Sequence, residues 1–355
     1  MVAASATISP IRLFPLGSAS APTRGTAIDT YGRAMTYLRI SLTDRCNFRC
    51  LYCMPAIGMK FQPKAEHLTD DELLRLVGLF AKTGVTKIRL TGGEPLVRRD
   101  VVDLVRALGR ELGSGLEELT LTTNGMRLAQ FAPELADAGV RRVNVSLDTR
   151  DRALFTRIAR RDGLPHVLAG IAAARAVGLS VKLNAVAMKG LNEGELPELI
   201  AWAHGEGHEL TLIEAMPLGE IDEDRFDHYL PLTAVRAQLE QRWTLVPSPH
   251  RSGGPARYFE VAETGGRLGF ITPLTGNFCE GCNRLRVTAT GALFMCLGGE
   301  GQVDLRPALR GPEPDAALTA ALDQAMLAKP ERHAFAIAAR GEKPALSRHM
   351  SLTGG

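Results

Sequence analysis

Three cysteines in one short segment are the side chains of this chain best suited to chemistry. Cys46, Cys50 and Cys53 follow one another at the spacing CxxxCxxC. Three thiolates this close together can hold one face of an iron-sulfur cluster, and because a [4Fe-4S] cluster has four irons, one iron stays open for another ligand. A structural zinc site normally closes with four Cys or His ligands, so a trio favours a catalytic cluster over a zinc knuckle or a disulfide.

A second trio of cysteines, Cys279, Cys282 and Cys296, lies toward the C-terminal end. It again offers three ligands and lacks a fourth, although His250 or His349 could complete a zinc site here. All six cysteines of the chain belong to these two trios. Because a group of three cannot pair internally, the cysteines favour metal clusters in a reducing compartment over disulfides.

The segments that must position these cysteines alternate between strand and helix. The predicted strands cover residues 37–42, 87–91, 116–122, 142–147, 180–187 and 209–214, and a capping box at Thr69 begins a helix that ends at Gly84. The other predicted helices cover residues 100–112, 128–138, 165–177 and 196–206. Six βα-type units predict an α/β fold, a partial TIM-type (β/α)6 barrel with a parallel sheet, and do not support a full eight-stranded barrel.

Further motifs fall where the predicted strands end, which is where parallel α/β sheets carry their active sites. They are Gly92-Gly93-Glu94-Pro95, Thr122-Thr123-Asn124-Gly125, Ser146-Leu147-Asp148 and Met216-Pro217. Glycines without a Cβ let the backbone approach a ligand closely, and Glu94 could accept a hydrogen bond from an ammonium group. The strand ends therefore predict one shared site with the first trio.

The alternation stops after Gly219. Short strands are predicted at residues 258–261, 268–271, 285–288 and 293–296, with a loop at 247–255 and a helix at 315–328. Period-two alternation places Arg284 and Arg286 on one face of a strand near the second trio, and phosphate is the best match for two such guanidinium groups. We predict three parts: a disordered extension over 1–30, the barrel over 31–220, and a smaller C-terminal domain over 221–355 that carries the second cluster.

The composition is that of an ordinary globular protein, with 45% hydrophobic and 23% charged residues among 355. The net charge of +3 is spread along the chain, so nucleic-acid binding is not expected. No apolar run reaches the 18 or so residues that a membrane span needs. A cytoplasmic location is expected, and the alternative is mitochondrial, because residues 1–28 contain no Asp or Glu and resemble a transit peptide.

The residues around the first trio resemble the radical S-adenosylmethionine (SAM) superfamily, whose CxxxCxxC loop carries an aromatic residue before its last cysteine, as Tyr52 does, and whose GGEP motif matches residues 92–95. A narrower resemblance, from about residue 31 to residue 355, is to the GTP 3′,8-cyclases, the family that begins molybdenum-cofactor synthesis. It is carried by residues 39–50, 87–96, 121–125 and 144–148, by the second trio with Arg284 and Arg286, and by the closing Gly354-Gly355.

The resemblance implies two [4Fe-4S] clusters and SAM. Cys46, Cys50 and Cys53 would hold the cluster that binds SAM, and Cys279, Cys282 and Cys296 would hold a second cluster whose open iron binds the guanine of GTP. The implied SAM contacts are Tyr52, Gly93, Glu94, Ser146 and Met216. The implied GTP contacts are Arg39, Lys87, Arg89, Thr122, Lys182, Arg284 and Arg286. Gly354 and Gly355 would reach into the active site as a flexible tail.

The implied reaction is that of a radical SAM lyase, carried by the first trio with Arg284 and Arg286. An electron enters the first cluster, SAM gives methionine and a 5′-deoxyadenosyl radical, and this radical abstracts the 3′ hydrogen of GTP. Attack of C3′ on C8 gives (8S)-3′,8-cyclo-7,8-dihydroguanosine 5′-triphosphate. The implied partners are GTP, a reductant protein or other electron donor, the next enzyme of the pathway (cyclic pyranopterin monophosphate synthase), and a second copy of the chain in a homodimer.

One position departs from the family pattern. The family commonly has an Arg where this chain has Thr211, so one cation near the pocket is lost. Two alternatives also stay open: a radical SAM peptide maturase, whose substrate would not need Arg284 and Arg286, and a non-enzymatic zinc protein. Because the chain lacks a GxxxxGK[ST] loop, side-chain cations must hold a triphosphate if the cyclase interpretation is right.

Overall fold

The computed structural model describes residues 26–337 and 339–354. Most of the predicted N-terminal extension, residues 1–25, and the terminal Gly355 lie outside the described residues. Residues 26–30, which we expected to be disordered, are instead held by the fold. The Ala27 amide donates to the Thr83 carbonyl at 3.0 Å, and Asp29 binds Arg33 at 2.6 Å. The predicted extension is therefore too long by these residues.

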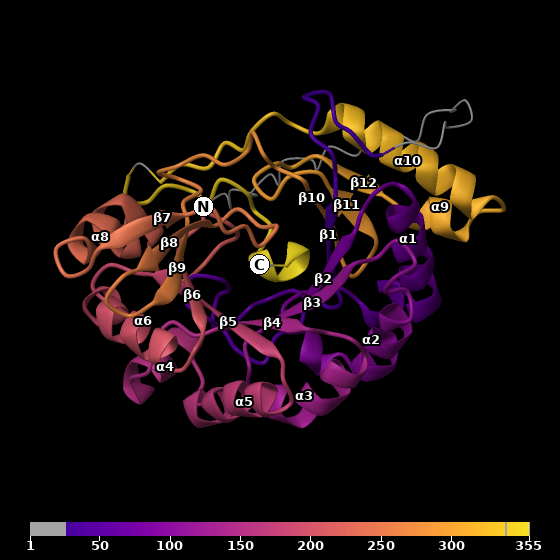
Figure 1. Cartoon of the computed structure of the whole chain (residues 1–355). Coiled ribbons are helices and arrows are strands. Elements are labelled where there is room, and N and C mark those ends of the chain that lie inside the picture. Colours follow the sequence, from indigo (N-terminus) through magenta and orange to yellow (C-terminus); the bar gives the residue numbers. More distant parts are fainter. Residues whose placement is uncertain (1–25, 338, 355) are drawn as a thin grey trace.

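Six consecutive strands form the parallel sheet that the sequence predicts. They are β1 (Tyr37–Ser41), β2 (Lys87–Thr91), β3 (Glu118–Thr123), β4 (Arg142–Ser146), β5 (Ser180–Ala187) and β6 (Glu209–Glu214). Each strand pairs in parallel with the next one along the chain. The connecting helices cover the outside of the curved sheet (Figure 1), so the apolar core lies between the sheet and these helices.

The helices begin and end close to the residues that local signals predict. The main ones are α1 (Asp70–Lys82), α2 (Val101–Gly109), α3 (Leu128–Asp137), α4 (Arg152–Ala159), α5 (Leu164–Ala176) and α6 (Leu196–Gly205). The capping box is present: the Thr69 hydroxyl accepts from the Glu72 amide, and the Glu72 carboxylate accepts from the Thr69 amide. We did not predict α4, which is short and begins where the Asp151 carboxylate accepts from the Leu154 amide.

The C-terminal strands extend both edges of the same sheet. In chain order they are β7 (Leu245–Ser248), β8 (Arg257–Val261), β9 (Gly266–Ile271), β10 (Arg284–Val287), β11 (Ala292–Phe294) and β12 (Gln302–Asp304). Strand β9 pairs in parallel with β6 at one edge, and β10 pairs in parallel with β1 at the other. The twelve-stranded order is β12-β11-β10-β1-β2-β3-β4-β5-β6-β9-β8-β7, so the parallel part grows from six strands to eight without closing between β9 and β10.

The remaining helices are short, except α10. They are α7 (Arg225–His228), α8 (Leu232–Leu239), α9 (Arg306–Arg310), α10 (Pro314–Ala328) and α11 (Met350–Thr353), with single 3-10 turns at Lys64–Glu66, Pro95–Val97 and Glu193–Glu195. Helices α9 and α10 lie beside α1 on the outside, whereas α11 lies inside the ring of strands, where it contacts β1 (Figure 1). No helix within the described ranges is long and apolar enough to cross a membrane.

Candidate active site

The first trio lies in the loop that follows β1. Cys46, Cys50 and Cys53 are free thiols that line one pocket inside the barrel, at the C-terminal ends of the parallel strands. The Cys53 and Met54 amides both donate to the Cys50 carbonyl, at 2.9 and 3.1 Å, so the loop turns tightly here. Three soft sulfur donors facing one cavity fit the donor set of an iron-sulfur cluster.

The predicted glycines of the GGEP motif are required by backbone packing. A Cβ on Gly93 would lie 2.4 Å from the Arg45 carbonyl oxygen, and a Cβ on Gly92 would lie 2.3 Å from that of Thr43. The Gly93 amide donates to the Thr43 carbonyl at 2.7 Å. The two glycines thus let the GGEP segment press against the segment that leads into the cysteine loop, and both also line the first pocket.

Glu94, which we predicted to accept a hydrogen bond from an ammonium group, is held by donors of this chain. Its carboxylate accepts from the Leu96 amide at 3.0 Å, the Asn124 amide at 2.7 Å and the Thr123 hydroxyl at 2.8 Å. The side chain is buried, burial raises its pKa to about 7, and it is absent from the residues lining the pocket. Glu94 therefore joins the GGEP segment to the end of β3, and its contact with the ammonium group of SAM stays a prediction.

The other predicted SAM contacts do line the first pocket, together with a residue that we did not assign. Tyr52, Gly93, Ser146 and Met216 all border it. The Tyr52 hydroxyl donates to the Asp148 carboxylate at 3.0 Å, and the Val186 amide donates to the other oxygen at 2.8 Å. Burial raises the pKa of Asp148 to about 6, so it is ionised at neutral pH and fixes the Tyr52 ring. The Ser146-Leu147-Asp148 motif at the end of β4 was the sequence signal that could have identified Asp148 as a site residue.

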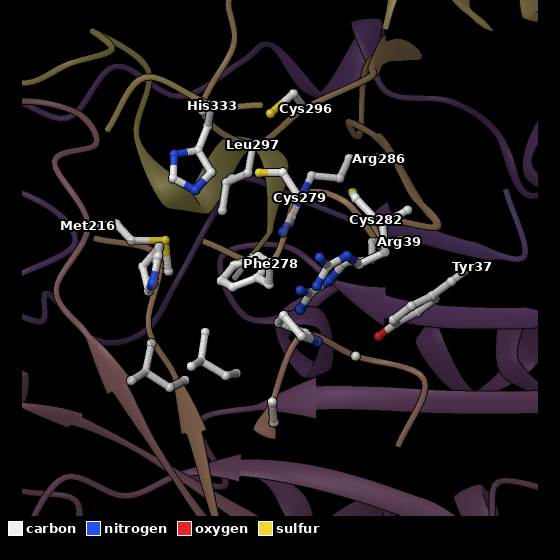
Figure 2. A pocket seen from close by; sticks show the side chains of 18 of the residues that line it. Tyr37, Arg39, Met216, Phe278, Cys279, Cys282, Arg286, Cys296, Leu297 and His333 are labelled. Carbon is white, nitrogen blue, oxygen red and sulfur yellow. The ribbon is translucent and has the colours of Figure 1, made fainter. Parts of the chain in front are cut away.

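The second trio borders a second pocket. Cys279, Cys282 and Cys296 lie on one side of it, near Phe278 and His333 (Figure 2). Neither His250 nor His349 lines this pocket: His250 meets the Tyr258 ring edge to face with ring centroids 4.7 Å apart, and His349 lies against Gly219. Neither histidine therefore completes the zinc site that we kept as an alternative. His333, which we did not single out, lies beside the trio instead.

Five of the predicted cations line the second pocket. They are Arg39, Arg89, Lys182, Arg284 and Arg286, and no Asp or Glu is among the described residues that border the cavity. Arg39 pairs in register with Arg89 on one neighbouring strand and with Arg286 on the other. Burial, with repulsion from Arg89 and Arg284, lowers the pKa of Arg39 to about 10, so it remains charged. Crowded like charges without a carboxylate favour a bound polyanion.

Two other predicted GTP contacts lie elsewhere. The Lys87 ammonium is 2.6 Å from the Glu118 carboxylate and donates to the Ser252 carbonyl at 2.9 Å, at the opposite end of the strand from the GGEP motif. Thr122 borders the first pocket, where its hydroxyl accepts from Arg89 at 3.0 Å. Lys87 faces the same side of β2 as Arg89, as predicted, but its ion pair holds it outside the second pocket.

The structure shows what surrounds Thr211. This residue is fully buried, and a Cβ on Gly269 would lie 2.7 Å from the Thr211 hydroxyl and 3.0 Å from the Tyr258 ring. The Tyr258 hydroxyl contacts the Lys182 ammonium and donates to the Ser252 hydroxyl at 2.7 Å. A small Thr and a Gly thus make room for the Tyr258 ring beside Lys182.

The two pockets share a wall. Asn184, Ile213 and Met216 border both, so the two trios border adjoining pockets in the interior of the barrel. The C-terminal segment enters this interior: Met350 and Ser351 border the first pocket, and Arg286 donates to the Gly354 carbonyl and, at 3.3 Å, to the Thr353 carbonyl. Gly354 thus lies beside Arg286, its role in the site stays a prediction, and Gly355 lies outside the described residues.

Comparisons with known proteins agree with this arrangement. The family model described as "Radical SAM superfamily" matches residues 40–203, and "Molybdenum Cofactor Synthesis C" matches residues 208–335. The chain is 67% identical to the GTP 3′,8-cyclase of Erythrobacter litoralis over 92% of this chain and 98% of that one, and 59% identical to that of Agrobacterium fabrum over 92% and 94%.

A solved structure supports the fold. The crystal structure of Streptococcus suis SuiB bound to S-adenosylmethionine superposes with a TM-score of 0.55 at 16% identity, covering 80% of this chain and 66% of that one. With the two trios, the cation-lined pocket and these relatives taken together, the chain belongs to the GTP 3′,8-cyclase family of the radical SAM superfamily.

Proposed function

We propose that this chain converts GTP to (8S)-3′,8-cyclo-7,8-dihydroguanosine 5′-triphosphate. The observation that carries the proposal is that the two cysteine trios border adjoining pockets with a common wall, one of them lined by five cations and no carboxylate among the described residues. When bound, the [4Fe-4S] cluster and SAM at the first trio supply the 5′-deoxyadenosyl radical that takes the 3′ hydrogen of GTP. The rival peptide maturase offers no reason for the cations.

The proposed roles divide between the two pockets. Cys46, Cys50 and Cys53 hold the first cluster, and Tyr52, Gly93, Ser146 and Met216 surround SAM. Cys279, Cys282 and Cys296 would hold the second cluster, which would supply a binding site for the guanine. Arg39, Arg89, Lys182, Arg284 and Arg286 hold the triphosphate. The ribose then lies at the common wall, where Asn184, Ile213 and Met216 keep it against the first pocket and exclude water.

We propose the domain division at residue 220 as a division of roles. Residues 31–220 carry the first trio and the SAM pocket, and residues 221–355 carry the second trio and the tail. Both parts share one sheet. The electron donor, the enzyme that takes the product, the homodimer and the cytoplasmic location remain predictions from the sequence.

The decisive experiment is anaerobic incubation of the reconstituted protein with SAM, a reductant and each nucleoside triphosphate in turn. We expect release of 5′-deoxyadenosine to depend on GTP, and GTP deuterated at C3′ to pass deuterium into that product. Equal stimulation by ATP, CTP or UTP, or unlabelled 5′-deoxyadenosine from the deuterated substrate, would refute the proposal.

Binding of GTP should be accompanied by proton uptake at Lys182. Burial, with repulsion from Arg89, lowers the pKa of Lys182 to about 7, so its amine is largely neutral at pH 8. A nearby triphosphate favours the charged form and raises this pKa, so the amine takes up a proton on binding at pH 8 and gains little below pH 6. Calorimetry at pH 8 in buffers of different ionisation enthalpy measures the uptake.

Lys182→Arg is the control for this prediction, because it keeps a cation that does not titrate in this range. Comparing the two proteins separates proton uptake by Lys182 from uptake by the nucleotide and by Tyr37. Burial raises the pKa of Tyr37, but the charges of Arg89, Arg39 and Lys87 outweigh this effect, and the pKa is lowered to about 8. The uptake should fall by roughly one proton in the variant. Identical uptake in both proteins would remove Lys182 from the phosphate site.

Gly354→Ala should lower turnover about tenfold without unfolding the protein, a loss equivalent to about 1.4 kcal/mol of transition-state stabilisation. Gly354 has φ +74°, and an added Cβ would lie 2.2 Å from the Thr91 Cγ2 atom, so the tail would leave its place beside Arg286. Gly341→Ala is the matched control, since Gly341 has φ +76° and nothing within 4 Å of an added Cβ. Equal rates of 5′-deoxyadenosine release from the two variants would show that the tail's position does not matter.

A further inference from the structure

Three cations hold the segments that carry the second trio. Arg33 donates to the Cys279 carbonyl at 2.8 Å, and Arg348 donates to the Cys296 carbonyl at 3.3 Å. Both of these contacts are to the backbone. Lys329 differs, because its ammonium nitrogen lies 3.8 Å from the Cys282 sulfur itself, within the range of an N–H···S hydrogen bond.

The Lys329 ammonium group joins three separate pieces of chain. Besides the Cys282 sulfur, it donates to the Arg284 carbonyl at 3.0 Å and to the Met295 carbonyl at 2.5 Å. Arg284 begins β10, and Met295 directly precedes Cys296. The three N–H bonds of an ammonium group are thus all used, and they fix Cys282 relative to Cys296.

Lys329 is a buried cation that needs a negative charge. Lys329 directly follows α10, and only 3% of its surface is exposed. Among the residues that the structure describes, no Asp or Glu forms an ion pair with Lys329, and Asp29, which acts on it from nearby, is bound to Arg33 at 2.6 Å. Burying an ammonium group costs several kcal/mol unless an anion faces it. The groups placed to supply that charge are the sulfurs of Cys282 and Cys296.

We propose that Lys329 is a positioning residue of the second trio, which donates a hydrogen bond to the Cys282 sulfur and raises the reduction potential of the cluster that this trio holds. The inference rests on the proposed role of the second trio as a cluster site. A positive charge and a hydrogen bond to a ligand sulfur both stabilise the reduced cluster, which carries the extra negative charge. No electron transfer to the substrate is required by this role.

The test measures the potential of the second cluster alone. In the full-length chain with Cys46, Cys50 and Cys53 all changed to Ala, reconstitution should leave about 4 Fe per chain at the second trio. An EPR-monitored redox titration without SAM or GTP then compares this parent with Lys329→Met. We expect the equilibrium constant for reduction to fall about tenfold, which is about 59 mV toward more negative potential for one electron.

Two further variants make the result specific. Lys343→Met removes the same charge from an exposed position and should leave the potential unchanged. Lys329→Gln keeps an N–H donor and removes the charge, so it should give a smaller shift in the same direction, and it replaces Lys329→Met if that protein fails to fold.

The outcomes are distinct. An unshifted potential with full iron content in Lys329→Met, or in Lys329→Gln if the first does not fold, overturns the proposal. A shift equal to that of Lys343→Met overturns it as well. Absence of iron from the parent with an intact Lys329 instead overturns the proposed role of the second trio, and so the proposed function.

Discussion

Replacing Cys50 with Ala is expected to abolish the release of 5′-deoxyadenosine. Cys50 is the central member of the first trio, and its loop is held by hydrogen bonds from the Cys53 and Met54 amides to its carbonyl, which the substitution leaves intact. The fold should therefore persist while one of three cluster ligands is lost. The iron content should fall from about 8 to about 4 Fe per chain, because the second trio lies in the other pocket and keeps its cluster.

Cys296→Ala is the matched control for this result. It removes one ligand from the second trio and leaves the first pocket unchanged, so SAM binding should persist while formation of the cyclised product stops. Normal 5′-deoxyadenosine release from Cys50→Ala would contradict the assignment of the first trio. Loss of all iron from Cys50→Ala would show that the two sites do not assemble independently.

Replacing both Arg284 and Arg286 with Ala is expected to weaken GTP binding by at least about 100-fold and to leave SAM binding unchanged. Both arginines border the second pocket on β10, and neither borders the first. Hydrogen bonds to charged groups contribute roughly 1.5–3 kcal/mol each, and about 1.4 kcal/mol corresponds to tenfold in affinity. Titration calorimetry with GTP and separately with SAM measures both affinities.

The control for this double variant removes two arginines from the outside of the barrel. Arg106 on α2 and Arg157 on α4 are exposed, so changing both to Ala gives the same change in net charge without touching either pocket. GTP affinity should then change by less than about twofold at physiological salt, since distant surface charges are screened. If the two double variants weaken GTP binding equally, the effect is one of net charge, and the proposed phosphate site is wrong.

Much of the barrel was predictable because its signals are local. Apart from the missed helix α4, the strand and helix alternation from β1 to β6 matched the structure within a few residues, since period-two and helical patterns, the Thr69 capping box and helix-ending glycines act over short stretches of chain. The shared location of the first trio, the GGEP motif and the Ser-Leu-Asp motif followed from one rule, that parallel strands present their C-terminal ends at the same edge.

Spacing alone does not show which partner a side chain has in the folded chain. Glu94 and Lys87 both occupy plausible positions in the sequence, but Glu94 is taken by the Asn124 and Leu96 amides and Lys87 by Glu118. Asn124 and Glu118 come from other parts of the chain, and a single sequence does not reveal which of several partners lies nearest. The same holds for the zinc site, where His333 and neither His250 nor His349 borders the second trio.

The sequence by itself determined the two cysteine trios, the six-strand parallel core and the face on which Arg284 and Arg286 lie, because each depends on residues close together in the chain. Only the tertiary structure decided that β9 and β10 join opposite edges of that core, that the two pockets share Met216, and that Lys329 reaches the Cys282 sulfur. Those contacts join residues far apart in the chain, and they form only when the whole barrel packs.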